Sequence, residues 1–144
     1  MTTQPTQKFL SLSEEDFLDL EAKRRWVREH YEPQAEENYQ TLEGKLSLID
    51  TILASNWIGP HETLKLQCLG ITFGDALEQR LGLEWQMVED EYGRDPALVQ
   101  VGTSIVVFPQ TSISKRIEAG EVVDVYELFE SACHTIQRVR DEIA

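Results

Sequence analysis

The sequence predicts an α+β domain: three helices, then a small antiparallel sheet of three strands, then one short and one long helix. Apolar residues recur with a helical period up to Leu81, alternate with polar residues from Leu83, and return to the helical period after Pro109. The length of 144 residues, 41% of them hydrophobic, fits one globular domain. We expect residues 1–10 to form a flexible N-terminal arm and residues 11–144 to form the domain.

The first helix is predicted to begin at Ser13, which can cap it with Asp16 three residues further on. Leu12 and Phe17 occupy the two positions of a hydrophobic staple. Pro33 is expected to end the helix, because proline pushes the residue before it out of the α conformation. The residues expected on its buried face are Phe17, Leu18, Leu20, Ala22, Trp26, Val27 and Tyr31.

Two more helices are predicted over residues 34–56 and 62–81. The first carries an apolar seam of Tyr39, Leu42, Leu46, Ile49 and Leu53. The second contains Gly70 and Gly74, four positions apart, and each glycine costs a helix about 1 kcal/mol relative to alanine. We therefore expect another element to approach the helix closely there. Gly82 supplies the C-terminal stop.

Three strands are predicted after Gly82, over residues 83–88, 98–101 and 103–109. The alternation in the first strand is expected to turn Leu83, Trp85 and Met87 toward the helices, with Glu84 and Gln86 facing away. The third strand is apolar on both faces, which is typical of a central strand. Between the first two, the residues YGRDP (92–96) are interpreted as a turn, since glycine and proline favour one.

The chain is predicted to end in two helices. Thr111 or Ser112 begins the short one and Gly120 ends it, while Asp124 caps the last helix with Glu127 completing a capping box. The buried stripe expected on that helix consists of Leu128, Phe129, Ala132, Ile136, Val139 and Ile143.

The net charge of −13, from 13 basic and 26 acidic residues, argues against nucleic acids and anionic membranes as partners. It is compatible with a basic protein partner. No apolar run has the length of a membrane span, and the first residues lack a signal-peptide core, so a cytoplasmic location is expected. Cys68 and Cys133 are expected to be buried, reduced thiols, and no spacing of residues predicts a metal or cofactor.

Carboxylates follow the first strand directly, at Glu89, Asp90 and Glu91. Two of them share one face of an extended chain, so a hard cation is one interpretation, while a solvated strand end leading into a turn is the favoured one. Arg94 is expected to pair with nearby acids. The polar residues offered here as candidates for ligand recognition are Asp90, Tyr92, Arg94 and Asp95.

A second candidate is the basic cluster Ser114, Lys115 and Arg116 on the short helix, which could bind an anion. His30, His61 and His134 stand in different segments, and no nucleophile with an adjacent base is evident. No phosphate-binding loop or nucleophile-elbow motif occurs either, so the sequence favours a protein without catalytic activity but leaves an enzyme open.

The motifs LGxxFGxALxxxLGLEW, DEYGRDPAL and ISKRIEAGE, with an FP strand end between the last two, occur in this order. In combination they resemble a family of bacterial domains of unknown function, over about residues 66–124. The resemblance implies a bacterial, cytosolic source, and it transfers no catalytic residue.

Two functional hypotheses follow. The first is a non-enzymatic protein-interaction module, of which an acidic inhibitor or immunity-type protein is one form, because acidic surface steers a basic partner. The alternative is a small-ligand-binding protein or enzyme that uses the DEYGRDP turn together with Ser114, Lys115 and Arg116. The structure can distinguish these two hypotheses, because only the alternative requires that the turn and the basic helix line one pocket.

Overall fold

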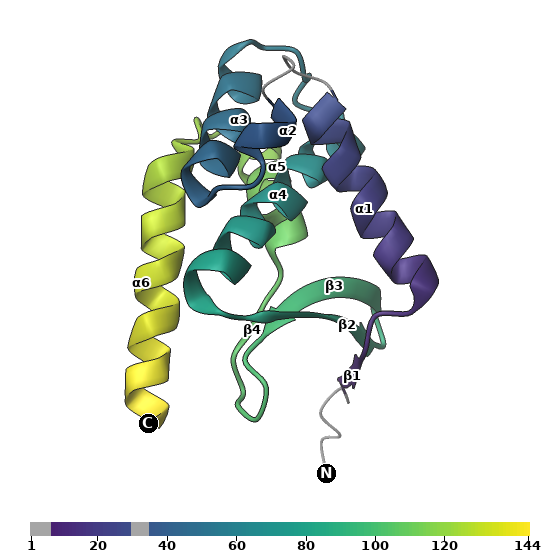
Figure 1. The fold of residues 1–144 in the computed structure, drawn as a ribbon, viewed down its shortest axis with the longest axis vertical. Coiled ribbons are helices and arrows are strands. Elements are labelled where there is room, and N and C mark those ends of the chain that lie inside the picture. Colours follow the sequence, from purple (N-terminus) through teal and green to yellow (C-terminus); the bar gives the residue numbers. More distant parts are fainter. Residues whose placement is uncertain (1–6, 30–34) are drawn as a thin grey trace.

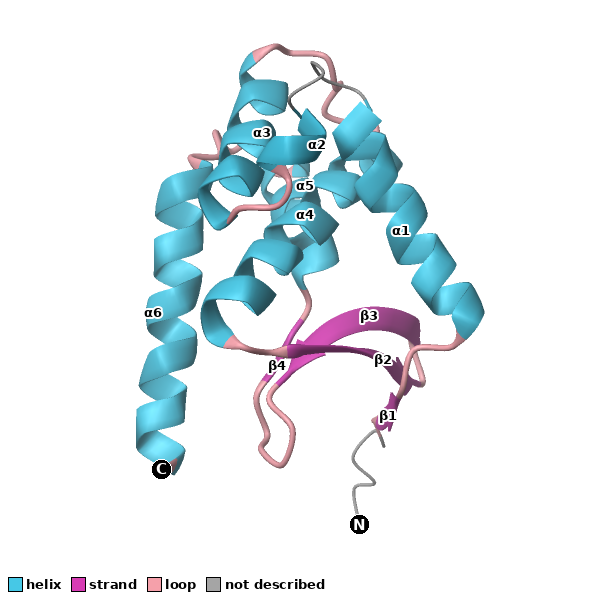
Figure 2. Cartoon of the chain, in the orientation of Figure 1, coloured by secondary structure: helices cyan, strands magenta, loops and turns pink. Residues whose placement is uncertain are grey.

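The computed structural model describes residues 7–29 and 35–144. This part of the chain contains six α-helices and a four-stranded antiparallel sheet, so the α+β class predicted from the sequence is confirmed. Figure 1 shows the sheet on one side of the molecule, the helices α1 to α5 over one of its faces, and α6 along one flank. Figure 2 shows the same separation of helices and strands.

Helix α1, Glu14–Glu29, begins where its cap predicts. Ser13 Oγ accepts the Asp16 amide at 3.1 Å, and Asp16 Oδ2 accepts the Ser13 amide at 2.9 Å. The prediction that a broad apolar face of this helix is buried is wrong, because Phe17 and Leu18 are 51% and 59% exposed. Helix α1 packs mainly on one neighbour, α4, so only a narrow stripe of it is covered. The expectations for Tyr31 and Pro33 lie outside the described residues.

The expected second helix is in fact two, α2 (Ala35–Asn38) and α3 (Leu42–Ala54). Thr41 starts a new helix because its hydroxyl accepts the Gly44 amide at 2.9 Å, which replaces a helical backbone bond. A Cβ on Gly44 would lie 1.9 Å from the Asn38 carbonyl oxygen, so the sharp turn requires glycine. The turn directs the ring of Tyr39 into the interior, where it is 7% exposed.

Helix α4, Thr63–Leu81, is the central helix. It ends at Gly82, as the sequence predicts, and this glycine has a φ of 67°. Its glycines allow close approach, which confirms the expectation from their spacing. A Cβ on Gly70 would lie 2.2 Å from the backbone oxygen of Gln110, in the short 3₁₀ helix η1 (Pro109–Thr111). A Cβ on Gly74 would lie 2.6 Å from the ring of Trp85.

The sheet has the order β1-β2-β3-β4, with strands Lys8–Leu10, Glu84–Asp90, Gly93–Val99 and Val106–Val107. This corrects the expected three strands to four, because Lys8–Leu10 pairs with Met87–Glu89 instead of lying in a free arm. The third apolar run is also not central. Its strand β4 is short and lies at an edge, and Ile105 just before it is buried in the core.

The hairpin between β2 and β3 is tighter than expected. Its turn is Glu91–Tyr92, closed by the pair Asp90 and Gly93, and Gly93 has φ of 138°. The Tyr92 amide donates to Asp90 Oδ1 at 2.8 Å. Pro96 therefore lies inside β3, where it is tolerated because β4 pairs only further along the strand.

The buried side of β2 is as predicted, since Leu83, Trp85 and Met87 are buried and Glu84 is exposed, whereas Gln86, expected to face outward, is half-buried. Helix α5, Ser112–Glu118, follows η1 and packs against α4. Helix α6, Val125–Ile143, begins at Asp124 as predicted, and Oδ1 of Asp124 accepts two backbone amides. Its stripe is shorter than expected, because Ile143 at the end is 47% exposed.

Candidate functional site

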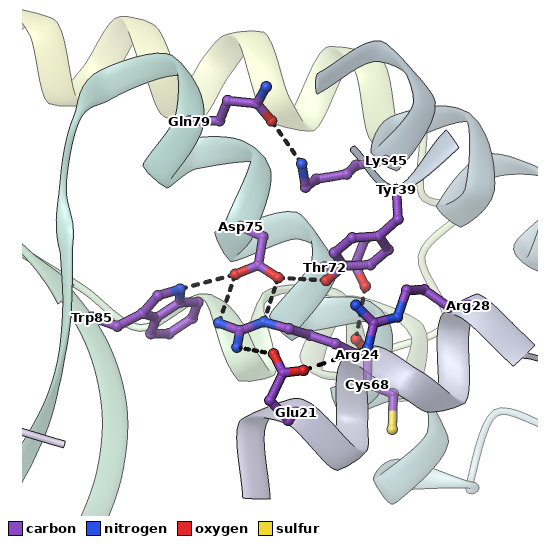
Figure 3. A network of polar contacts seen from close by, with 10 residues as sticks. All are labelled: Glu21, Arg24, Arg28, Tyr39, Lys45, Cys68, Thr72, Asp75, Gln79 and Trp85. Carbon is purple, nitrogen blue, oxygen red and sulfur yellow. Dashed lines mark hydrogen bonds and ion pairs between the residues drawn. The ribbon is translucent and has the colours of Figure 1, made fainter. Parts of the chain in front are cut away.

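A polar cleft of about 640 Å³ opens between α1, the α2–α3 turn, α4 and the start of β2. Apolar side chains form part of its rim, and charged and aromatic side chains form its floor. Its lining residues are Leu12, Phe17, Glu21, Arg24, Arg28, Tyr39, Gln40, Lys45, Asp75, Glu78, Gln79, Glu84 and Trp85. Figure 3 shows the polar network at its centre, with Asp75 between Trp85 on one side and Tyr39 on the other.

Asp75 is 5% exposed and holds the network together. Its Oδ2 accepts Arg24 Nε at 2.7 Å and the hydroxyl of Tyr39, and its Oδ1 accepts Arg24 Nη2 and Trp85 Nε1, each at 3.0 Å. Four donors from three other elements therefore converge on one carboxylate. A buried carboxylate that accepts this many hydrogen bonds, two of them from an arginine, fixes the side chains around it.

Arg24 links this carboxylate to a second one, because its Nη1 donates to Glu21 Oε1 at 2.8 Å. Burial alone would lower the pKa of Arg24, but the bonds and charge of Asp75 outweigh it and raise that pKa. Burial, and then the charge of Asp75, also raises the pKa of Tyr39 well above its usual range. Both groups therefore keep their protons, so neither serves as a general base at neutral pH.

The cationic side of the cleft is formed by Arg28 and Lys45. Arg28 Cζ lies 5.5 Å and Lys45 Nζ 5.3 Å from the centre of the Tyr39 ring, within cation–π range. Lys45 is 7% exposed, and burial lowers its pKa. Burial likewise raises the pKa of Glu78 on the neighbouring helix α4. This arrangement of two cations beside carboxylates can bind a charged ligand.

The hairpin candidates lie elsewhere, next to α1. Both Nη atoms of Arg94 donate to the carboxylate of Asp16, with Nη2 to Oδ2 at 2.7 Å, and its Nε lies 3.9 Å from Glu89. The bonds from Arg94 hold the pKa of Asp16 well below its usual range against the opposing effect of burial. Tyr92 is 85% exposed at the hairpin tip, Asp95 is exposed, and Asp90 caps the turn.

The three residues of the basic cluster on α5 differ in their exposure to solvent. Ser114 is 2% exposed and its hydroxyl donates to the Thr111 carbonyl at 3.4 Å, whereas Lys115 and Arg116 are exposed. Arg94 lines a pocket of about 530 Å³ beside α1. Arg116 lines two pockets beside α6. None of these three pockets contains residues of both groups, so the structure does not bring the turn and the basic helix together there.

Sequence reasoning missed the cleft. Asp75 is the single charged residue in the run GITFGDAL of α4, and a charge within a buried apolar helix is a signal for a buried network. Its partners Arg24 and Tyr39 carry no such signal, because they are 51 and 36 positions away.

Within residues 7–29 and 35–144, no cluster of three or more His, Cys, Asp or Glu side chains is placed to hold a metal ion. In the same part of the chain, none of the helices has both the length and the apolar character needed to cross a bilayer. Cys68 and Cys133 are free and buried, and burial raises the pKa of both thiols, as expected for unreactive cysteines.

The structure is that of a small α+β domain with a charged cleft between its helices and the start of β2. Residues 45–129 match a family described as "Domain of unknown function (DUF3806)". This match covers more than half of the chain, so the chain belongs to that family. It includes the whole of residues 66–124, over which the sequence motifs resemble a family of this kind.

One solved structure is similar, a crystal structure from Bacteroides thetaiotaomicron VPI-5482 with a TM-score of 0.71 and 18% sequence identity. The alignment covers 90% of this chain and 48% of the other, so this chain spans about half the length of that protein. At this identity the likeness concerns the fold alone. A comparison with curated proteins found no match.

Proposed function

We propose that this domain is a non-enzymatic protein-interaction module that binds a basic protein through an acidic face. The face is made by the β2–β3 hairpin and the first turn of α1. The observation that carries the proposal is the ion pair between Arg94 and Asp16, which ties the hairpin to α1 across 78 positions of sequence. It thereby joins two acidic segments into one surface.

Carboxylates dominate this surface. Its exposed or half-exposed acids are Glu14, Glu15, Asp19, Glu89, Asp90, Glu91 and Asp95. Two of the cations among them are engaged, because Arg94 binds Asp16 and Lys23 Nζ lies 2.6 Å from Asp19, while Lys8 is exposed opposite Glu89. A surface of one charge sign accelerates the capture of an oppositely charged protein and rejects acidic ones.

The surface also offers places for partner side chains. Tyr92 projects from the hairpin tip, and tyrosine is a residue type enriched among the energetic centres of interfaces. The pocket of about 530 Å³ beside Arg94 is lined by Glu15, Asp19 and Gln110. Gln110 Oε1 is buried and accepts no hydrogen bond from any described residue, and Lys23 and Arg94 also line the pocket. A lysine or arginine of the partner would find hydrogen-bond acceptors in this pocket.

An inhibitor or immunity-type protein is the specific form that we propose for such a module, in a bacterial cytoplasm. The acidic face would then cover a basic surface of the target. Acidic residues that face an enzyme's cationic site block it by charge complementarity, and such pairs associate rapidly at low salt.

The test uses purification from a lysate of the source organism, followed by binding measurements with the purified partner. Glu15→Lys/Glu91→Lys reverses charge on the acidic face, and Asp50→Lys/Glu142→Lys reverses as much charge on α3 and α6. The face variant is expected to lose a stoichiometric partner that the control retains, and association with wild type should slow as salt rises. Absence of a stoichiometric partner, or equal binding by both variants, would contradict the proposal.

A further inference from the structure

Lys45 is a buried cation of the cleft without a carboxylate at ion-pair distance in the described part of the chain. It is 7% exposed, and its Nζ donates to Gln79 Oε1 at 2.7 Å. An ammonium group has three donors, so Lys45 retains donors beyond the bond to Gln79. A buried charge destabilises a protein unless it is compensated, which makes its position at the wall of an open cleft informative.

Arg28, in the last turn of α1, is the second cation with unused donors. Its closest carboxylate contact is Glu21 at 3.5 Å, which is long for a charge-assisted bond. Glu21 is already bound by Arg24 at 2.8 Å. The charged groups of Arg28 and Lys45 both lie over the ring of Tyr39. Figure 3 shows these two incompletely paired cations on opposite sides of the Tyr39 ring, and both line the cleft.

Apart from the 3.5 Å contact between Arg28 and Glu21, no ion pair joins these two cations to a carboxylate among the described residues of the cleft. Asp75 is occupied by Arg24, Tyr39 and Trp85, which leaves it little capacity to accept a further donor. These bonds hold the aromatic walls in place, so the cleft is preorganised without a ligand. Figure 3 shows that Lys45 and Gln79 lie apart from the Asp75 centre, on the side of the cleft formed by α3 and α4.

We propose that Lys45 binds the carboxylate group of a small organic ligand in this cleft, and that Arg28, across the Tyr39 ring, adds positive potential. The volume of about 640 Å³ lies within the range of roughly 300–1,000 Å³ typical of small-molecule sites. Trp85, Phe17 and Leu12 contribute apolar surface for the rest of the ligand. This site is separate from the acidic face, so it does not depend on the proposed protein partner.

A carboxylate fits better than a phosphate because acids also line the cleft. Glu78 and Glu84 would repel a dianion about twice as strongly as a monoanion at the same distance. The unused donors of Lys45 can bond the oxygens of a carboxylate, and the charge of Arg28 favours a monoanion in the same cleft. Burial lowers the pKa of Lys45, and a bound anion would act in the opposite direction and raise that pKa.

The experiment is a titration followed by NMR of backbone amides and tryptophan indoles, at constant ionic strength. The probes are acetate, succinate and inorganic phosphate. Because Trp85 Nε1 donates to Asp75 at the cleft floor, its indole signal reports on occupancy. We expect saturable shifts at Trp85 and Gln79 with acetate and succinate, and weaker binding of phosphate. Absence of a saturable shift with both carboxylates, or tighter binding of phosphate, overturns the proposal.

Substitutions distinguish a ligand-binding role of Lys45 from a purely structural role. Lys45→Met keeps the length of the side chain and removes the charge, so carboxylate binding should be lost while the thermal midpoint stays constant or rises. Arg28→Gln, at a more exposed position, should weaken binding several-fold in a folded protein. Lys115→Met on α5 is the matched control and should bind as wild type. Unchanged binding in Arg28→Gln, together with a lowered midpoint in Lys45→Met, assigns Lys45 a structural role and overturns the proposal.

Discussion

Replacement of Asp75 by asparagine is the most informative test of the buried network. The carboxylate is 5% exposed and accepts from Arg24 at 2.7 and 3.0 Å, from Trp85 at 3.0 Å, and from Tyr39. Asparagine keeps the shape but removes the charge, and its amide NH₂ must face one of these donors. Arg24, whose side chain is 13% exposed, is then left with Glu21 as its counter-ion.

Removal of one partner from a buried ion pair costs about 3–5 kcal/mol. With a urea dependence of about 2 kcal/mol per molar, the unfolding midpoint should fall by about 2 M. Urea denaturation followed by circular dichroism measures this, and Asp50→Asn on the exposed face of α3 serves as the control, with an expected change within about 0.5 kcal/mol.

A double-mutant cycle distinguishes loss of the ion pair between Asp75 and Arg24 from a defect caused by the new asparagine amide. Arg24→Met should cost less in the Asp75→Asn background than in wild type, because the pair is already broken. A loss below about 1 kcal/mol for Asp75→Asn would be typical of an exposed pair and would refute the argument that this network holds α1 against α4.

Three further predictions follow from close packing, burial and charge. Gly74→Ala should cost about 1–3 kcal/mol in urea denaturation, because the new methyl group meets the Trp85 ring and Pro109; Gly59→Ala, with its nearest atom at 3.6 Å, should be tolerated, and equal costs would be inconsistent with the packing. Both cysteines should resist a bulky thiol reagent until the protein unfolds, and rapid labelling of the native protein would show that their burial is wrong. The hairpin arginine holds the pKa of Asp16 below its unfolded value near 4, so this carboxylate stabilises the fold above that pH and its contribution fades as the pH falls. The stability difference between wild type and Asp16→Asn should therefore shrink between about pH 5 and pH 2, and a constant difference would contradict this linkage.

Elements with local signals were predicted well. Ser13, Gly82 and Asp124 begin or end helices through bonds to residues within four positions, so a single stretch of sequence contains both partners. The alternation around Trp85 likewise predicted which side of β2 is buried, because the period of a strand fixes the face of every side chain.

Elements that depend on distant neighbours were predicted poorly. Lys8–Leu10 forms a strand only because β2 offers it an edge, and three residues carry no pattern of their own. The apolar run before Pro109 suggested a central strand, but its burial comes partly from packing of Ile105 in the core. Phe17 and Leu18 were expected to be buried because a helical pattern shows which residues share a face but not how wide a face its neighbours cover.

The sequence by itself determined the α+β class, the boundaries of most helices, the buried face of β2 and the net negative charge. The tertiary structure decided where the charges meet. Arg24 reaches Asp75 across 51 positions, and Arg94 reaches Asp16 across 78, through ion pairs that no local pattern encodes. An ion pair between distant residues forms only when packing of whole helices and strands brings them together, so the cleft and the joined acidic face arise from the fold rather than from any one segment.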